Sequence, residues 1–158
     1  LAGKGPLVKQ IKKICDNEEN IVYLGWINQN EIEKHLLSCH LVYCVFDPNV
    51  ENYRYATPIK MLEAMAYGIP VMVSRKTISE RVVDSERCGV AVTYGDIKEI
   101  RNAILNLKNN PGLCKALGQN GRNAAVREYN WKSMEERLLN LYLKLLNDKN
   151  PKQNNREL

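Results

Sequence analysis

The sequence predicts an α/β protein built on a doubly wound parallel sheet, in a single domain that ends in C-terminal helices. Residues 41–46 are apolar throughout, as expected for a strand that is covered on both faces in a parallel sheet. Short apolar runs of this kind alternate with segments of helical periodicity along most of the chain. This alternation is typical of parallel strands joined by right-handed helical crossovers, and 158 residues are enough to bury a core.

The individual elements follow from apolar periodicity and from turn residues. Further strands are expected at residues 21–24, 71–73 and 90–93. Helices are expected at residues 6–14, 30–38, 58–67, 79–83, 97–108, 112–128 and 132–146. Residues 47–57 are predicted to form a polar loop, and residues 148–158 a polar tail outside the fold. Asn30 and a box of Ser133 with Glu136 are the expected caps of their helices.

The stretch from Thr57 to residue 73 is the most informative part of the chain. Thr57 is the expected N-cap of a helix, Pro58 suits its first position, and Gly68 supplies a left-handed stop. Lys60 lies in the first turn, where a cation opposes the helix macrodipole unless an anion is bound there. Backbone N–H groups at Ile59 and Lys60 would add to such an anion site.

Residues 63–71, Glu-Ala-Met-Ala-x-Gly-x-Pro-Val, closely resemble the donor-binding motif of family 4 retaining glycosyltransferases, which have two Rossmann-like domains. The resemblance covers most of the chain. It includes a Gly-x-Gly-Pro turn, a base-binding turn after the strand at 21–24, a Glu before a Val-rich helix, and an Asn-Trp helix entry. These features are Gly3 to Pro6, Gly25 to Ile27, Glu80, and Asn130 with Trp131. The resemblance implies that residues 1–147 are the C-terminal, nucleotide-sugar-binding domain and that an N-terminal part is missing.

The same resemblance assigns the site. Glu63 would accept hydrogen bonds from the ribose hydroxyls, and Lys60 would contact the pyrophosphate, so both are the catalytic candidates. The family's first Glu should lie eight residues before Glu63, where this chain has Tyr55, and Glu51 is a substitute in the same loop. The other residues implied in donor binding are Gly3, Gly5, Gly25, Trp26, Ile27, Tyr55, Thr57, Pro58 and Ile59.

The full enzyme implied by the resemblance transfers a hexose from a UDP- or GDP-sugar to an acceptor hydroxyl with retention and without metal. The acceptor, a glycan or a lipid, would contact the missing domain, so this chain alone should bind donor and catalyse poorly. Two alternatives stay open: a non-catalytic nucleotide-binding or interaction subunit, because of Tyr55, and a nucleotide-sugar epimerase of the same architecture. These first two hypotheses, enzyme and non-catalytic subunit, are distinguished by whether the gene encodes another α/β domain upstream in the same chain.

Composition and charge limit the metal sites, binding partners and cell compartments that this protein can have. Five scattered cysteines without a Cys-x-x-Cys pair indicate reduced thiols and no zinc site, which favours the cytoplasm. A net charge of +5 suits anionic ligands or the inner face of a membrane, and is too small to predict nucleic-acid binding. We therefore expect a cytoplasmic protein, with peripheral membrane association as an option that the charge allows.

Overall fold

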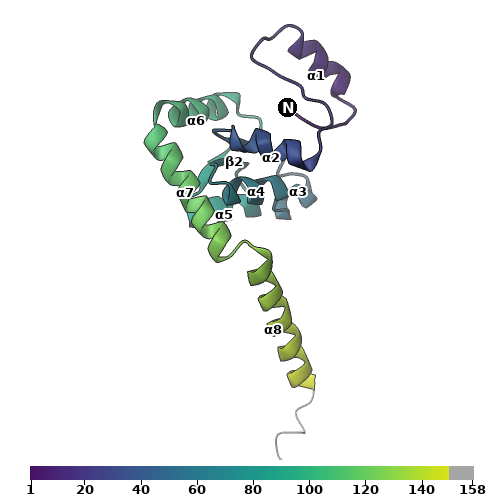
Figure 1. Ribbon diagram of the computed structural model, residues 1–158, viewed down its shortest axis with the longest axis vertical. Helices are drawn as coiled ribbons and strands as arrows, with labels where there is room; N and C mark the ends of the chain where they lie inside the picture. Colours follow the sequence, from purple (N-terminus) through teal and green to yellow (C-terminus); the bar gives the residue numbers. More distant parts are fainter. Residues whose placement is uncertain (150–158) are drawn as a thin grey trace, which may run out of the picture. The chain divides into compact units, whose positions relative to one another are not determined.

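The computed structural model describes residues 1–149, and contacts within it divide the chain into two compact units (Figure 1). The first unit, Leu1–Cys39, contains helices α1 (Val8–Cys15) and α2 (Gln29–Leu37). The second, His40–Leu158, contains the sheet and all later helices. The assignment of residues 1–147 to one nucleotide-sugar-binding domain stays a prediction.

The strand predicted at residues 21–24 does not form, so that prediction was wrong. The segment instead makes a short parallel-type pairing with the beginning of the chain. The Leu24 N–H donates to the Leu1 carbonyl oxygen at 2.7 Å, and the Leu1 ammonium donates to the Val22 carbonyl oxygen at 2.7 Å. A β-branched run needs a partner of matching length to become a strand, and this pairing covers too few residues.

Helix α2 begins one residue before the predicted Asn30, because its cap is Asn28 and not Asn30. The Asn28 Oδ1 atom accepts the Glu31 N–H at 3.0 Å, and the Asn28 N–H donates to Glu31 Oε2 at 3.1 Å. This is a complete capping box, which satisfies two helix-end donors at once. Asn28 takes the cap because Glu31 lies three residues after it.

The sheet of the second unit has three parallel strands in the order β1 (Val42–Cys44), β2 (Val71–Ser74) and β3 (Gly89–Val92). Val42 lies opposite Val71, and Val71 lies opposite Gly89. Three of the predicted strands are therefore confirmed in place, with β1 shorter than residues 41–46. Because the strands are parallel, their carboxyl ends share one edge of the sheet, where ligands bind in open α/β sheets.

Five longer helices complete the second unit. They are α4 (Ile59–Ala66), α5 (Ile78–Glu86), α6 (Ile97–Asn109), α7 (Pro111–Arg127) and α8 (Trp131–Lys149). Within residues 1–149, none of the helices has the length and apolar character needed to cross a membrane. Their positions confirm the predicted alternation of strand and helix, with boundaries shifted by one to three residues.

A short helix, α3 (Glu51–Tyr55), replaces the predicted polar loop at residues 47–57. The Tyr53 and Arg54 N–H groups both donate to the Val50 carbonyl oxygen, at 3.0 and 3.1 Å. The Tyr53 ring packs on Phe46 with their centroids 5.2 Å apart. This contact with the end of β1 favours a helical turn in a segment that has no helical periodicity of its own.

The core lies between the sheet and the helices packed on it. Its fully buried side chains include Met61, Met65, Val71, Met72, Val73, Val83 and Val92. Helix α7 packs on α4 through two glycines, so that a Cβ on Gly118 would overlap the Gly68 carbonyl oxygen. Gly68 itself has φ +72° and ends α4, as the sequence predicts.

Helix α8 differs from the prediction at both ends. Its cap is Asn130, whose Oδ1 atom accepts the Ser133 N–H at 3.0 Å, and not the Ser133 box. The helix continues to Lys149, so residues 148 and 149 are helical and not tail, while residues 150–158 lie outside the described part. Several large apolar residues of α8 are exposed; they include Leu138, Leu139, Tyr142, Leu145 and Leu146.

Candidate functional site

The candidate residues form two groups, one in each compact unit. In the first unit, the Gly3 N–H donates to the Gly25 carbonyl oxygen at 2.7 Å, and the Tyr23 hydroxyl donates to the Gly3 carbonyl oxygen at 2.6 Å. Gly3 and Gly25 have φ of +133° and +73°, which side chains with a Cβ rarely adopt. Backbone conformation alone therefore requires both glycines.

Beside this turn, Trp26 is 68% exposed and the Lys4 Nζ atom lies 5.0 Å from the centroid of its ring. Ile27 is half-buried and precedes the Asn28 cap. Gly5 is exposed, and a Cβ there would meet no atom within 4 Å. The turn thus presents an accessible aromatic face next to a cation, which is suited to stacking on a planar, anionic ligand.

In the second unit, the candidates lie around the beginning of α4. Thr57 makes no capping bond, so its prediction as N-cap was wrong. Pro58 takes the cap position instead of the first helical position, and its carbonyl oxygen accepts the Met61 N–H at 2.9 Å. Ile59 and Lys60, both exposed, are the first helical residues. The first N–H groups of a helix have no acceptor within it, so this end offers donors to a ligand.

Lys60 is held over an aromatic ring at the carboxyl end of β1. Its Nζ atom lies 5.0 Å from the centroid of the Phe46 ring, a cation–π contact. Burial raises the pKa of the nearby Cys44 thiol to about 11, and the charge of Lys60 acts in the opposite direction. The cation and the positive end of α4 therefore sit together with no neutralising carboxylate from the first turn of the helix.

Glu63 is half-buried and lies three residues after Lys60 on α4. Side chains three apart are neighbours on a helix surface, so the two catalytic candidates share one face. Tyr55, at the end of α3, is 63% exposed. The roles of these residues in binding stay predictions, whereas the position of Lys60 over the Phe46 ring is observed.

Ser74 fixes the loop that carries Phe46. The Phe46 N–H donates to Ser74 Oγ at 2.7 Å, and Ser74 Oγ donates back to the Phe46 carbonyl oxygen at 2.5 Å. Ser74 ends β2 and is 1% exposed. This buried hydroxyl therefore connects the ends of two neighbouring strands. Sequence reasoning missed it, because its partner lies 28 residues away.

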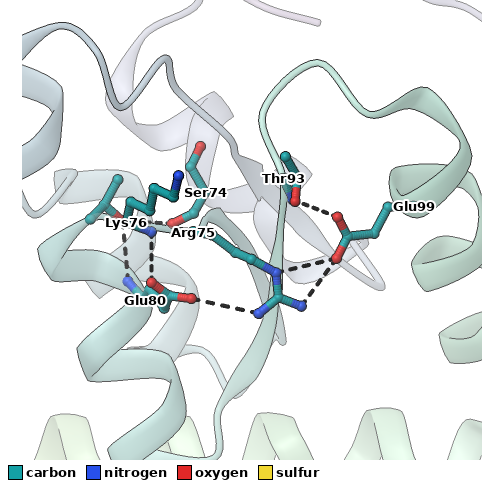
Figure 2. A network of polar contacts seen from close by, with 7 residues as sticks. Ser74, Arg75, Lys76, Glu80, Thr93 and Glu99 are labelled. Atoms are coloured by element: carbon teal, nitrogen blue, oxygen red, sulfur yellow. Dashed lines mark hydrogen bonds and ion pairs between the residues drawn. The ribbon is translucent and has the colours of Figure 1, made fainter.

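The loop after β2 is held by a network of charges (Figure 2). The Arg75 guanidinium pairs with Glu99 at 3.0 Å and with Glu80 at 3.6 Å. Hydrogen bonds from Thr93, followed by the one from Arg75, hold the pKa of Glu99 below its usual value. Two carboxylates therefore balance the charge of Arg75.

Lys76, the next residue, has φ +62°, a left-handed conformation that costs a residue with a Cβ about 1–2 kcal/mol. Its N–H donates to Glu80 Oε2 at 2.6 Å, which holds the turn (Figure 2). Thr77 caps α5, since its Oγ1 atom accepts the Glu80 N–H at 3.2 Å. Glu80, which the family resemblance singles out, is therefore a residue that shapes this loop.

A cavity of about 450 Å³ lies between α3 and this loop, and we call it the basic pocket. Its walls include Arg54, Tyr55, Lys76, Thr77, Glu80 and Arg81. The size is that of a small-molecule site. Tyr55 is the one named donor-binding candidate among these wall residues, and the resemblance also singles out Glu80. The position of the loops after parallel strands predicts that residues 47–57 and 74–78 lie at the same edge of the sheet, whereas the particular cations that line the pocket were not predicted. Over residues 1–149, no cluster of three or more His, Cys, Asp or Glu side chains could hold a metal ion.

The sequence model of the family described as "Glycosyl transferases group 1" matches residues 1–124. The chain belongs to this family. Two curated relatives are mycobacterial enzymes. The MMP α-(1→4)-mannosyltransferase of Mycolicibacterium hassiacum is 33% identical over 54% of this chain and 21% of its own length. A GDP-mannose-dependent α-(1-6)-phosphatidylinositol monomannoside mannosyltransferase of Mycolicibacterium smegmatis is 24% identical over 89% of this chain and 38% of its own length.

Solved structures show the same fold as this group 1 chain. The sucrose-phosphate synthase of Thermosynechococcus elongatus gives a TM-score of 0.73 at 22% identity, over 92% of this chain and 38% of that one. Anabaena HepE, solved with UDP-glucose, gives 0.72 at 18% identity, over 87% and 36%. The C-terminal domain of a group 1 family protein from Francisella tularensis gives 0.64 at 21% identity, over 79% and 63%. The predicted α/β class with a parallel, Rossmann-like sheet is confirmed.

The chain spans less than two-fifths of the length of these two curated relatives. It corresponds to one part of such a protein, in agreement with the prediction of a partial, domain-sized piece.

Proposed function

We propose that this chain is the donor-binding part of a retaining glycosyltransferase that uses a nucleoside-diphosphate hexose. Membership of the group 1 family supports the activity. The observation that carries the site is the position of Lys60, in the first turn of α4 and over the Phe46 ring. A lysine and a helix N-terminus that face the same space form a site for the diphosphate of such a donor.

The chemistry follows from this position. As the bond between the sugar and the diphosphate breaks, negative charge develops on the leaving phosphate. Lys60 and the N–H groups at the start of α4 would stabilise that charge, which lowers the barrier in the way oxyanion donors do. Glu63 would hold the donor by accepting hydrogen bonds from the ribose diol, since a carboxylate can accept two at once. We expect this stabilisation to require no metal ion.

The printed names of the relatives guide the choice of substrates. The M. smegmatis relative is named for GDP-mannose and for a phosphatidylinositol mannoside acceptor, and HepE was solved with UDP-glucose. We therefore propose a GDP- or UDP-hexose donor and a glycan or lipid acceptor that contacts protein beyond this chain. Such a role belongs to family 4 enzymes of polysaccharide or glycoconjugate synthesis, in the cytoplasm or at the inner face of a membrane.

A non-catalytic nucleotide-binding subunit is the second candidate. The observation that favours it is Tyr55, a neutral and exposed residue at the position where the resemblance expects a carboxylate. Both candidates bind the nucleotide, and only the first transfers sugar. The activity of a longer protein that includes the preceding domain would separate them.

The test of the donor site compares the parent chain with Lys60→Ala in calorimetric titrations of uridine, UMP and UDP, and of guanosine, GMP and GDP. A lost charge-assisted contact of about 1.5–3 kcal/mol should weaken diphosphate binding by roughly ten- to a hundredfold and leave nucleoside binding unchanged. Lys98→Ala is the matched control, because Lys98 is also the exposed second residue of a helix, α6. Equal losses for nucleoside and diphosphate, or none, would contradict the proposed role of Lys60.

A further inference from the structure

The basic pocket carries a charge pattern that the binding of a neutral hexose does not explain. Three cationic side chains, Arg54, Lys76 and Arg81, line it together with one carboxylate, Glu80. The carboxylate is already used, because Glu80 Oε2 accepts the Lys76 N–H at 2.6 Å and Oε1 pairs with Arg75 at 3.6 Å. A neutral N–H donor does not cancel the charge of the carboxylate, so Glu80 offsets one of the three positive charges, and the lining keeps a surplus of two.

None of the three cations forms an ion pair within the described part of the chain. The Arg54 Nε atom donates to the Pro48 carbonyl oxygen at 3.1 Å, a neutral acceptor that leaves the charge of the guanidinium uncompensated. Lys76 and Arg81 are exposed. Like charges that line one concave surface repel one another, and an anion in the cavity turns this repulsion into attraction.

The pocket also lies beside the proposed diphosphate site. Tyr55 forms one wall of the pocket and is followed, four residues later, by Ile59 at the beginning of α4. Four residues span at most about 14 Å, which sets an upper limit on the separation between this wall of the pocket and the beginning of α4. The Ser79 hydroxyl donates to the Ala56 carbonyl oxygen at 3.2 Å, which fixes this connecting segment against α5.

We propose that the basic pocket binds a carboxylate on the sugar of the donor, so that the substrate is a nucleoside-diphosphate uronic acid. This inference rests on the proposed function and names the class of its donor. Arg54, Lys76 and Arg81 would attract the carboxylate, and the Tyr55 hydroxyl can donate a hydrogen bond to it. A carboxylate in place of Tyr55 would repel such a group, which accounts for the neutral residue at this position.

The experiment measures the affinities of matched pairs of nucleotide sugars for the 158-residue chain. The pairs are UDP-glucuronate with UDP-glucose and GDP-mannuronate with GDP-mannose, and each differs only by the carboxylate. Charge-assisted contacts predict that the uronate of at least one pair binds about tenfold or more tightly than the neutral sugar. This preference should fall as the salt concentration rises, because exposed charges are screened.

Lys76→Gly is the informative variant. Glycine adopts the left-handed conformation without strain, and the bond to Glu80 comes from the backbone N–H, so the loop should keep its shape. Arg87→Gly is the matched control: Arg87 is an exposed cation with φ +49° at the end of α5, and it does not line the pocket. Lys76→Gly should reduce the preference for the uronate to less than about threefold, while Arg87→Gly leaves it unchanged.

The possible failures are distinct. Absence of binding by UDP and GDP themselves would overturn the proposed function and this inference with it. Binding of the nucleotides without preference for a uronate, or a preference that survives both Lys76→Gly and Arg81→Gln, would overturn the inference alone. A third outcome is that free glucuronate binds in a way that depends on Lys76 but does not compete with UDP-glucuronate. The carboxylate would then belong to the acceptor and not to the donor, and the inference would also be overturned.

Discussion

The buried hydroxyl of Ser74 is expected to support both the stability of the sheet edge and the position of the binding loop. In Ser74→Ala, the Phe46 N–H loses its acceptor at 2.7 Å and the Phe46 carbonyl oxygen loses its donor at 2.5 Å. An unsatisfied buried group costs about 1–3 kcal/mol. Phe46 is only partly buried, so water can reach its backbone groups in part, and the lower end applies to each. With about 1 kcal/mol for each of the two groups, the expected loss in the free energy of unfolding is about 2 kcal/mol.

The assay is urea denaturation followed by circular dichroism, with Ser85→Ala as the control. Ser85 also donates its hydroxyl to a backbone carbonyl oxygen, that of Val82 at 3.1 Å, but it is exposed on α5. Its removal should change the free energy of unfolding by less than about 0.5 kcal/mol. Nucleoside-diphosphate affinity should also fall in Ser74→Ala, because Phe46 supports Lys60. A loss no larger than that of Ser85→Ala would refute the role of Ser74.

Two further predictions concern packing and thiol chemistry. Gly118→Ala should destabilise the protein by about 1–3 kcal/mol in the same denaturation assay, because its Cβ would overlap the Gly68 carbonyl oxygen. The control is Gly112→Ala, on the same helix with open space around it, which should be neutral or stabilising. Equal effects of the two substitutions would mean that α7 does not approach α4 so closely. Burial raises the pKa of the Cys44 and Cys88 thiols to about 11, so that only about one in a thousand is ionised at pH 8. Ellman's reagent should therefore modify the exposed Cys39 first and all five thiols only in denaturant, and rapid labelling of all five in the native protein would contradict this.

Local signals in the sequence predicted most of the second unit. Gly68 ends α4 at φ +72° because a left-handed residue closes the helix, and this depends only on its neighbours. The apolar run at residues 41–46 places β1 because a strand covered on both faces must be apolar along its length. Lys60 was identified by a charge that opposes the dipole of its own helix, which is likewise a local argument.

Three of the differences from prediction depend on specific contacts. The run at residues 21–24 has strand composition, and its observed pairing is with Leu1 through two hydrogen bonds. Helix α3 forms in a segment without helical periodicity because Tyr53 packs on Phe46. Asn28, and not Asn30, caps α2 because the choice depends on which residue meets Glu31. In each case, a specific pairing outweighed the composition of the segment.

The sequence by itself determined the fold class, the alternation of three strands with the longer helices of the second unit, and the diphosphate candidates on α4. Periodicity and turn residues suffice for this because they act over a few neighbouring positions. Only the tertiary structure decided which side chains of the loops after β1 and β2 meet. Parallel pairing of β1 with β2 places the segment of Arg54 and Tyr55 against Lys76 and Arg81, and the hydroxyl of Ser74 fixes that arrangement. The side chains that line this pocket lie more than twenty residues apart in the chain, so their contact depends on the pairing of β1 with β2 and not on any pattern of neighbouring residues.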